Sequence, residues 1–299
     1  MQTLTIQDIC VVVVTYNPNP DEVVANILLL VSNSISICIV DNSTDLNCST
    51  KLSLLEQSNL HIITFNANLG IAKAQNVGSS WAFSSGYQAI VMVDQDSLIT
   101  STMIEALVKT YNELSASYKV ACLGPIAYDK DKGESSQYNS VTLDANTQVA
   151  YKVETTLSSG MLIHKEALLQ IGSMDEQLFI DLVDWEWCWR AKSKGYTVFV
   201  TPLVKMPHKL GEDRKSLGFS FSLGVPAPIR HYYQFRNYFL LLNREYVPFS
   251  FKIKYAIINT FKLFYYSTML RPRIRRFQYS LKGIKDGVTM MLSNRNLDV

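Results

Sequence analysis

The sequence predicts an α/β protein with a mostly parallel sheet flanked by helices, followed by a helical and basic C-terminal region. Three observations lead to this fold class. The first hundred residues contain four short, apolar runs rich in β-branched residues. Stretches with helical character alternate with these runs, as is typical of βαβ units with strands buried on both faces. Beyond residue 228 the chain becomes aromatic, basic and helical in pattern.

The four apolar runs give the expected strands of the sheet. They cover residues 8–15, 36–40, 61–65 and 89–93. Helices are expected at residues 21–31, 71–84 and 101–115, which gives the spacing of roughly 30 residues typical of one βαβ unit. After residue 116 the pattern is less regular, with helices expected from residue 165 to Gly172 and at residues 184–194, and a strand at residues 196–200.

Polar residues follow each of the four expected strands. They are Thr15, Tyr16 and Asn17 after the first, Asp41 after the second, Asn68 after the third, and Asp94 and Asp96 after the fourth. In open α/β sheets, ligands bind at the carboxyl edge of the strands. We therefore expect residues 1–116 to form a nucleotide-binding half.

Asp94 and Asp96 stand one residue apart where the fourth strand stops. Past the end of a strand the chain can turn and direct both carboxylates to one point. Mg²⁺ and Mn²⁺ prefer such oxygen ligands, and a Mg²⁺ site often combines one or two carboxylates with substrate phosphates. The alternative is a solvated loop that caps the next helix.

The segment from Asn68 to Gly78 carries amides and glycines where a strand passes into a helix. Backbone N–H groups at a helix start suit an anion, and glycine allows its close approach. An ordinary helix cap explains the same residues equally well.

Asp184 and Glu186 lie among three tryptophans on an expected helix. Glu186 and Arg190 form an i,i+4 pair, which indicates a structural role. Asp184 is not part of this pair and is available for catalysis, because a carboxylate beside aromatic surface can act as a general base. Its alternative role is a helix cap. His208 is a candidate metal ligand, although a lone histidine is more often structural.

The C-terminal region is basic. Residues 252–299 carry ten lysines and arginines against two acidic residues, a local charge of +8, while the rest of the chain sums to −6. An apolar stripe is expected on one helix, formed by Ile274, Phe277, Leu281, Ile284, Val288 and Met291. Such helices favour anionic membrane surfaces. The alternatives are packing on the rest of the chain or on a second subunit of a homo-oligomer.

The remaining sequence features limit the classes of protein to which the chain can belong. The net charge is only +2, which argues against a nucleic-acid partner. The five cysteines are scattered without paired spacing, as expected of a reduced, cytoplasmic protein. The N-terminus has no signal-peptide pattern, and no apolar run reaches the length of about 18 residues expected of a transmembrane helix.

Six motifs, in order, resemble the family 2 inverting glycosyltransferases, which have a glycosyltransferase-A, Rossmann-like fold. They are VVVVTYNPNP (11–20), IVDNSTD (39–45), NANLGIAKAQNVG (66–78), VDQDS (93–97), VDWEWCWRAKSKGY (183–196) and MPHKLG (206–211). The third and last of these, with FIDLVDWEW (179–187), are most similar to the rhamnosyltransferase branch that builds O-antigen and other bacterial surface polysaccharides.

The resemblance implies roles for particular residues. The nucleotide-binding positions correspond to Thr15, Tyr16, Asn17, Asp41, Asn68, Gly70 and Lys73. Asp94 and Asp96 would bind the cation and the donor's diphosphate, and His208 would complete the metal site. Gln95 between the two aspartates should matter little. The Glu-Asp pair typical of the base motif is Val183-Asp184 here, so only Asp184 is carried over, as the general base.

The resemblance also implies an activity and a place in the cell. We expect a metal-assisted, inverting transfer of L-rhamnose from dTDP-β-L-rhamnose to a lipid-linked glycan, by a peripheral protein at the inner face of the bacterial plasma membrane. A catalytic domain of residues 1–228, with an acceptor-binding half at 117–228, would precede a helical region at 229–299. The alternatives are a UDP-hexose donor, or a non-catalytic scaffold that binds a sugar nucleotide without turning it over.

Overall fold

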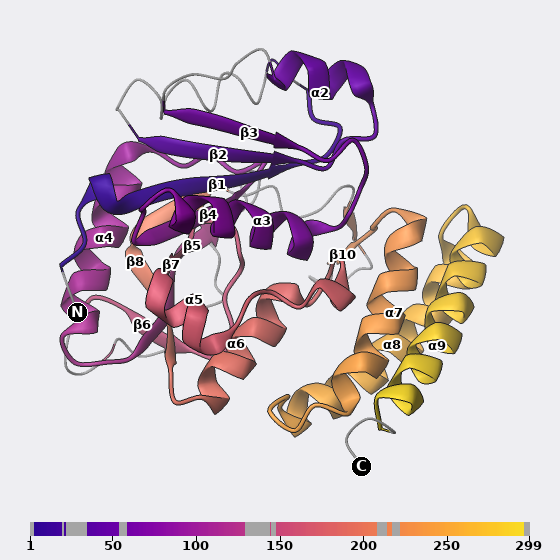
Figure 1. Ribbon diagram of the computed structural model, residues 1–299. Helices are drawn as coiled ribbons and strands as arrows, with labels where there is room; N and C mark the ends of the chain where they lie inside the picture. Colours follow the sequence, from indigo (N-terminus) through magenta and orange to yellow (C-terminus); the bar gives the residue numbers. More distant parts are fainter. Residues whose placement is uncertain are drawn as a thin grey trace.

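The computed structural model describes residues 3–19, 21, 35–53, 59–128, 144, 148–207, 214–216 and 222–295. It confirms the α/β class. An eight-stranded sheet has the order β3-β2-β1-β4-β7-β5-β8-β6, and a separate two-stranded ribbon pairs β9 with β10. The C-terminal helices lie together beside the sheet (Figure 1).

The four expected strands form one parallel half of the sheet. They are β1 (Ile9–Thr15), β2 (Ser36–Asp41), β3 (Leu60–Thr64) and β4 (Ala89–Asp94). The helices α3 (Ile71–Ser84) and α4 (Ser101–Ser115) occupy the expected ranges, and α2 (Leu46–Ser53) was not anticipated. The helix expected at residues 21–31 lies almost wholly outside the described residues.

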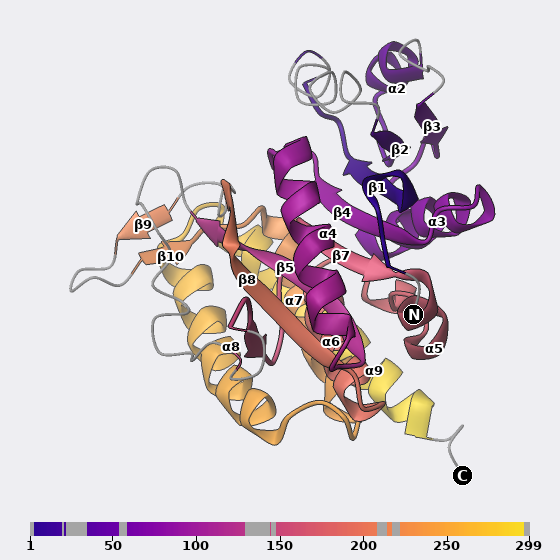
Figure 2. The same ribbon diagram turned by 90° about the vertical axis from the view of Figure 1, so that its left-hand side faces the viewer.

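Strand β1 shows why this half needs continuous apolar runs. All seven of its residues are buried. Cys10, Val12 and Val14 pack into the core on the side of α3, whereas Ile9, Val11 and Val13 pack into the core on the side of α4. Figure 2 shows α4 on one side of the sheet and α3 on the other. Because both faces of such a strand are covered, none of its side chains faces water, and apolar residues do not alternate with polar ones.

The second half of the chain completes the sheet with mixed strand directions. Its elements are β5 (Val120–Tyr128), β6 (Tyr151–Val153), β7 (Met161–His164), α5 (Lys165–Ile171), α6 (Val183–Ser193), β8 (Thr197–Pro207), β9 (Arg214–Ser216) and β10 (Ser222–Gly224). Two 3₁₀ helices, η1 (Ile6–Asp8) and η3 (Glu176–Leu178), complete the description up to residue 227. Strand β7 runs antiparallel to both β4 and β5, and β8 runs parallel to β5.

Three helices follow: α7 (Pro228–Leu242), α8 (Phe249–Met269) and α9 (Arg273–Arg295). Helix α9 packs closely on α7 through small residues. A Cβ atom on Gly283 would lie 2.4 Å from the Tyr232 carbonyl oxygen, and one on Gly287 would lie 2.9 Å from that of Arg236. The expected stripe is only partly covered: Ile274, Phe277 and Leu281 are exposed, whereas Ile284, Val288 and Met291 are half-buried.

Helix α8 carries a second apolar stripe that the sequence analysis did not single out. Its five members are each 50% to 76% exposed: Phe249, Ile253, Ile257, Phe261 and Phe264. Their spacing of three or four residues places them along one side of the helix. Among the described helices, none is both long and apolar enough to be a candidate for crossing a membrane.

The order of the strands determines where the candidate site lies. The chain runs from β1 outward to β2 and β3, then returns to place β4 on the other side of β1. The carboxyl ends of β1, β2 and β4 thus meet where the strand order reverses, which is where open α/β sheets bind ligands.

Candidate active site

Asp41 ends β2 and is completely buried. Its Oδ1 atom accepts hydrogen bonds from the hydroxyls of Thr15 (2.8 Å) and Ser43 (2.6 Å), and its Oδ2 atom accepts one from Ser49 (2.7 Å). A buried carboxylate needs such donors, because an unpaired one costs several kcal/mol or more. Asp41 therefore joins the ends of β1 and β2 to the loop and helix that follow.

Asn17 folds the same loop against the end of β1. Its backbone has a φ of +42°, a left-handed conformation that asparagine tolerates better than most residues. Its Oδ1 atom accepts hydrogen bonds from the backbone N–H groups of Thr44 (2.9 Å) and Asp45 (3.1 Å), and its own N–H donates to Ser43 Oγ at 2.8 Å. Asn17 thus joins the loop that follows β1 to the loop that follows β2.

Tyr16 is exposed, with 46% of its surface accessible. Its backbone N–H donates to the Gln95 side-chain oxygen at 2.7 Å. Gln95, the middle residue between the two aspartates, therefore ties their loop to the end of β1. The sequence analysis expected little from Gln95, since both aspartates of the motif are present. No local sequence pattern indicates its contact with Tyr16.

The start of α3 is capped by the protein itself. The N–H of Gly70 donates to Asn68 Oδ1 at 3.0 Å, and that of Ile71 donates to the carbonyl oxygen of Phe179 at 2.8 Å. Gly70 has a φ of +89°, and a Cβ atom here would lie 2.6 Å from the Phe179 ring. These contacts correspond to the helix-cap alternative for the segment.

Lys73 points toward the segment before α6. Its Nζ atom forms an ion pair with Glu176 at 3.1 Å. The same carboxylate accepts a hydrogen bond from Asn76 Nδ2 at 2.9 Å. Lys73 therefore connects α3 to η3.

Asp94 ends β4 and is half-buried, whereas Asp96 is exposed. Burial and the neighbouring Asp96 carboxylate raise the pKa of Asp94 to about 7, although the Arg230 guanidinium opposes the rise. The backbone N–H of Asp94 is held by Ser159 Oγ at 3.1 Å. A divalent cation would stabilise the ionised form of Asp94, which the neighbouring carboxylate disfavours.

Asp94 and Asp96 fit a cation site of the kind that substrate phosphates complete, because such sites use one or two protein carboxylates. Within the described ranges, no group of three or more histidine, cysteine, aspartate or glutamate side chains is placed to hold a metal ion. His208, the third expected ligand, lies outside the described residues.

Asp184 lies in the first turn of α6 and is half-buried. Its Oδ1 atom accepts a hydrogen bond from the N–H of Trp185 at 2.9 Å. Burial raises the pKa of Asp184 to about 6 against this hydrogen bond, and the negative charge of Asp94 raises it further. The position preceding α6 belongs to Leu182, and no side chain caps the helix there. Asp184 is thus poised to accept a proton near neutral pH.

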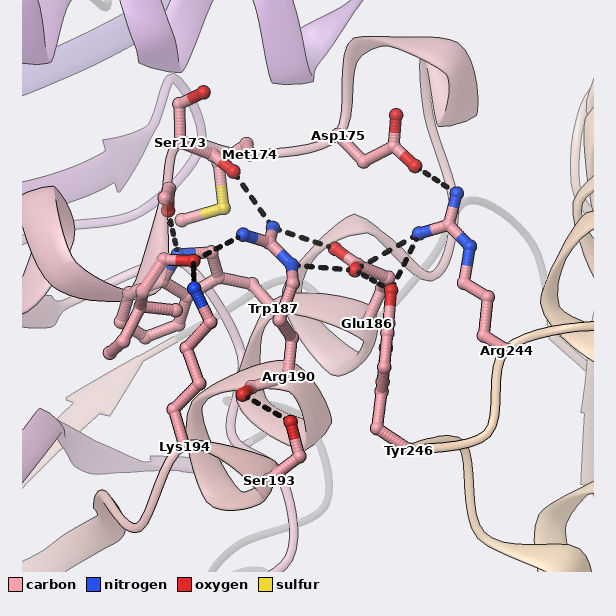
Figure 3. A network of polar contacts seen from close by, with 12 residues as sticks. Ser173, Met174, Asp175, Glu186, Trp187, Arg190, Ser193, Lys194, Arg244 and Tyr246 are labelled. Carbon is pink, nitrogen blue, oxygen red and sulfur yellow. Dashed lines mark hydrogen bonds and ion pairs between the residues drawn. The ribbon is translucent and has the colours of Figure 1, made fainter. Parts of the chain in front are cut away.

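Glu186, two residues further along α6, has no exposed surface and is the centre of a polar network (Figure 3). It accepts hydrogen bonds from Arg190 Nε (2.8 Å) and Tyr246 Oη (2.6 Å), and Arg244 Nη1 lies 3.0 Å away. Arg244 also pairs with Asp175. The expected structural role of the Glu186–Arg190 pair is confirmed, and the network extends to the turn between α7 and α8.

A model of the family described as glycosyltransferase-like family 2 matches residues 9–266. The chain belongs to this family. It is therefore a glycosyltransferase, as the six motifs led us to expect, and the match includes α7 and most of α8 as well as the sheet.

Two curated relatives and one solved structure extend this comparison. The dTDP-rhamnosyl transferase RfbF of Shigella flexneri is 33% identical over 287 residues, which cover 93% of each chain. The low-salt glycan biosynthesis hexosyltransferase Agl10 of Haloferax volcanii is 20% identical, over 87% of this chain and 83% of the relative.

The crystal structure of GalNAc-T7 with UDP, GalNAc and Mn²⁺ has a TM-score of 0.55 and 14% identity. The match covers 86% of this chain but only 55% of that one. It supports the glycosyltransferase-A-type fold, and the fold alone.

The Glu186 network gives a first testable prediction. Glu186→Gln keeps the shape of the side chain but leaves the Arg190 and Arg244 guanidiniums without their shared negative charge. Removing one partner of a buried ion pair costs about 3 kcal/mol. We expect that loss in the free energy of unfolding, measured by chemical denaturation.

The matched control is Glu154→Gln. Glu154 pairs with Lys192, but its side chain is 68% exposed. Screening by water limits such pairs to about 0.5 kcal/mol. Equal losses for the two variants would contradict the structural role assigned to Glu186.

Proposed function

We propose that the protein transfers L-rhamnose from dTDP-β-L-rhamnose to a hydroxyl group of a lipid-linked glycan, with inversion at the anomeric carbon. The observation that carries the donor assignment is the 33% identity to a dTDP-rhamnosyl transferase over 93% of both chains. The family match over residues 9–266 also spans the elements from the end of β1 to the first turn of α6.

Asp184 is the proposed general base. Its carboxylate takes the proton from the acceptor hydroxyl, and the oxygen attacks the anomeric carbon. The bond from that carbon to the donor's diphosphate breaks in the same step, and the diphosphate leaves with the bonding electron pair. A pKa of about 6 supports this role, because the group is ionised at neutral pH but basic enough to accept a proton.

Asp94 and Asp96 are the proposed ligands of Mg²⁺ or Mn²⁺, with His208 as a further ligand, and they face the donor's diphosphate. The cation supplies Lewis-acid stabilisation of the leaving group when it is bound. Tyr16, with its exposed ring, is the proposed contact for the nucleotide base. Thr15, Asn17, Asp41, Asn68, Gly70 and Lys73 are proposed to line or shape the nucleotide site.

The C-terminal helices are proposed to contact the anionic inner face of the plasma membrane. The exposed apolar stripe on α8 supports this, as do the exposed Ile274, Phe277 and Leu281 on α9. Exposed basic side chains accompany them, at Lys254, Arg271, Arg273, Arg275, Lys282 and Lys285. Each basic residue near an anionic surface contributes about 1 kcal/mol. A lipid-linked acceptor would be presented at that surface.

The donor assignment is tested with a panel of sugar nucleotides. We expect release of dTDP from dTDP-rhamnose in the presence of Mg²⁺ or Mn²⁺ and an acceptor lipid, and loss of release with EDTA. UDP-glucose, UDP-galactose and UDP-N-acetylglucosamine serve as competitors. If the protein preferred one of these UDP-sugars, the donor assignment would change to that sugar nucleotide, and the proposed mechanism would stand. Binding without turnover of any donor would favour the scaffold.

The base assignment is tested with Asp184→Asn. The amide keeps the shape of the side chain but cannot accept the proton. We expect transfer to fall by at least about 100-fold, the lower range for removal of a general base, while the donor Kd measured by calorimetry changes little. Loss of donor binding together with transfer would contradict this role.

The raised pKa of Asp184 gives a pH dependence. Because the base acts in its ionised form, the rate is full above the folded-state pKa and falls as pH drops through about 6. Below that point kcat should fall tenfold per pH unit, measured with donor and metal saturating at every pH. A flat profile down to pH 5 would exclude Asp184 as the base.

Membrane contact is tested by sedimentation with vesicles that contain phosphatidylglycerol. The double variant Ile257→Asp and Phe264→Asp places charges on the α8 stripe and should release the protein from the vesicles. Leu169→Asp, on α5, is the control because Leu169 is equally exposed, at 68%. Equal binding by both variants, or no binding by the unchanged protein at low salt, would contradict the proposal.

A further inference from the structure

The five residues that lead into the base helix, Leu178 to Leu182, adopt a strained backbone. Phe179, Asp181 and Leu182 have φ angles of +62°, +68° and +66°. Phe179 also has a ψ of −63°, and the N–H of Ile180 donates to the Leu178 carbonyl at 2.6 Å. This is the geometry of a γ-turn of the rare, strained kind. Such conformations persist only where the surroundings impose them.

A single side chain imposes most of this conformation. The Nδ2 atom of Asn237 in α7 lies within hydrogen-bond distance of three carbonyl oxygens of the segment: Leu178 at 2.9 Å, Ile180 at 2.7 Å and Asp181 at 2.9 Å. Its two N–H groups are shared among these three acceptors. The other two carbonyls have backbone partners. That of Phe179 accepts from Ile71, and that of Leu182 accepts from Glu186.

Asn237 is itself fixed in orientation. It has no exposed surface. Its Oδ1 atom accepts hydrogen bonds from Arg236 Nε (3.1 Å) and Nη2 (2.8 Å), so its amide nitrogen must face the segment. Arg236 Nη2 also donates to the carbonyls of Gln177 (2.6 Å) and Leu178 (2.9 Å). The guanidinium lies over the Tyr233 ring, which stacks in turn on Phe179.

The segment also contacts the nucleotide-binding half of the chain. The Phe179 carbonyl caps the start of α3, and the Phe179 ring fills the space beside Gly70. At its other end, Asp181 forms an ion pair with Arg230 of α7. The segment is thus held between α3 and α7, and it ends two residues before Asp184.

We propose that Asn237 is a positioning residue for the transfer reaction, which holds the strained segment so that Asp184 reaches the acceptor hydroxyl. This proposal rests on the assignment of Asp184 as the base. The hydrogen bonds from its amide group fix the carbonyls of residues 178, 180 and 181, and through them the direction in which α6 begins. A displacement of about 1 Å of a reacting group can cost about 100-fold in rate.

The test compares Asn237→Ala with Asn243→Ala. Asn243 directly follows α7 as its C-cap, and its Nδ2 atom donates to the Met291 carbonyl of α9 at 2.7 Å, on the side of α9 and not to the segment. Both variants remove an amide from the helical layer. Only the first removes the hydrogen bonds to the segment. Asn237→Ser, which keeps one hydroxyl donor, carries the same test if the alanine variant does not purify folded.

Three quantities are measured below the Tm of every variant, with the donor that the unchanged protein turns over. For Asn237→Ala we expect kcat to fall about 100-fold, with the donor Kd within threefold. We also expect faster hydrogen exchange at the amides of Ile71 and Ala72, since both approach the Phe179 carbonyl. For Asn243→Ala we expect neither change.

The proposal is overturned if Asn237→Ala keeps kcat within threefold of the unchanged protein, or if Asn243→Ala loses as much activity at equal stability. Unchanged exchange at Ile71 and Ala72 would also contradict it, because the segment would then stay in place without the amide. Failure of the base assignment is distinguishable: in that case Asp184→Asn remains active, whatever the Asn237 variants do.

Discussion

The buried carboxylate of Glu186 is the interaction on which the arrangement of the site depends. A charge with no exposed surface is tolerated only with good partners, and Glu186 has Arg190 from its own helix and Arg244 and Tyr246 from the turn after α7. Arg190 also donates to the carbonyls of Ile171 and Ser173. The network therefore fixes α6 against the preceding loop and the C-terminal helices, which makes those helices part of the site.

Three aspartates of the candidate site have different surroundings, and each is therefore suited to a different role. Asp41 is buried and its oxygens accept three hydroxyl hydrogen bonds, so it organises the ends of two strands. Asp94 lies beside another carboxylate, a setting suited to a cation. Asp184 accepts backbone hydrogen bonds, among them one from Trp185, but its burial still raises its pKa to about 6, which suits proton transfer. All three residues are aspartates, and differences in their burial and hydrogen bonding suit them to different roles.

Local sequence patterns predicted the parallel half of the sheet because its strands are buried on both faces, and they predicted α3 and α4 to the residue. Strand β5 was not predicted, because Gly124 and Pro125 interrupt its apolar run. The pairing of β5 with β8 shifts register directly after Pro125. The motifs singled out Asp94, Asp96 and Asp184 as candidates. They did not reveal Gln95 or Asn237, since the contacts of these residues join positions 79 and 56 to 59 apart in the chain.

The configuration of the product is the most direct measurement of the proposed reaction. A single displacement assisted by Asp184 must invert the anomeric carbon, so a β-linked dTDP-L-rhamnose donor gives an α-linked rhamnoside. The one-bond carbon–hydrogen coupling at that carbon, measured by NMR on the product glycan, distinguishes the two anomers. An α-linked product agrees with attack by an acceptor that Asp184 deprotonates. A β-linked product would mean retention and would contradict the single displacement.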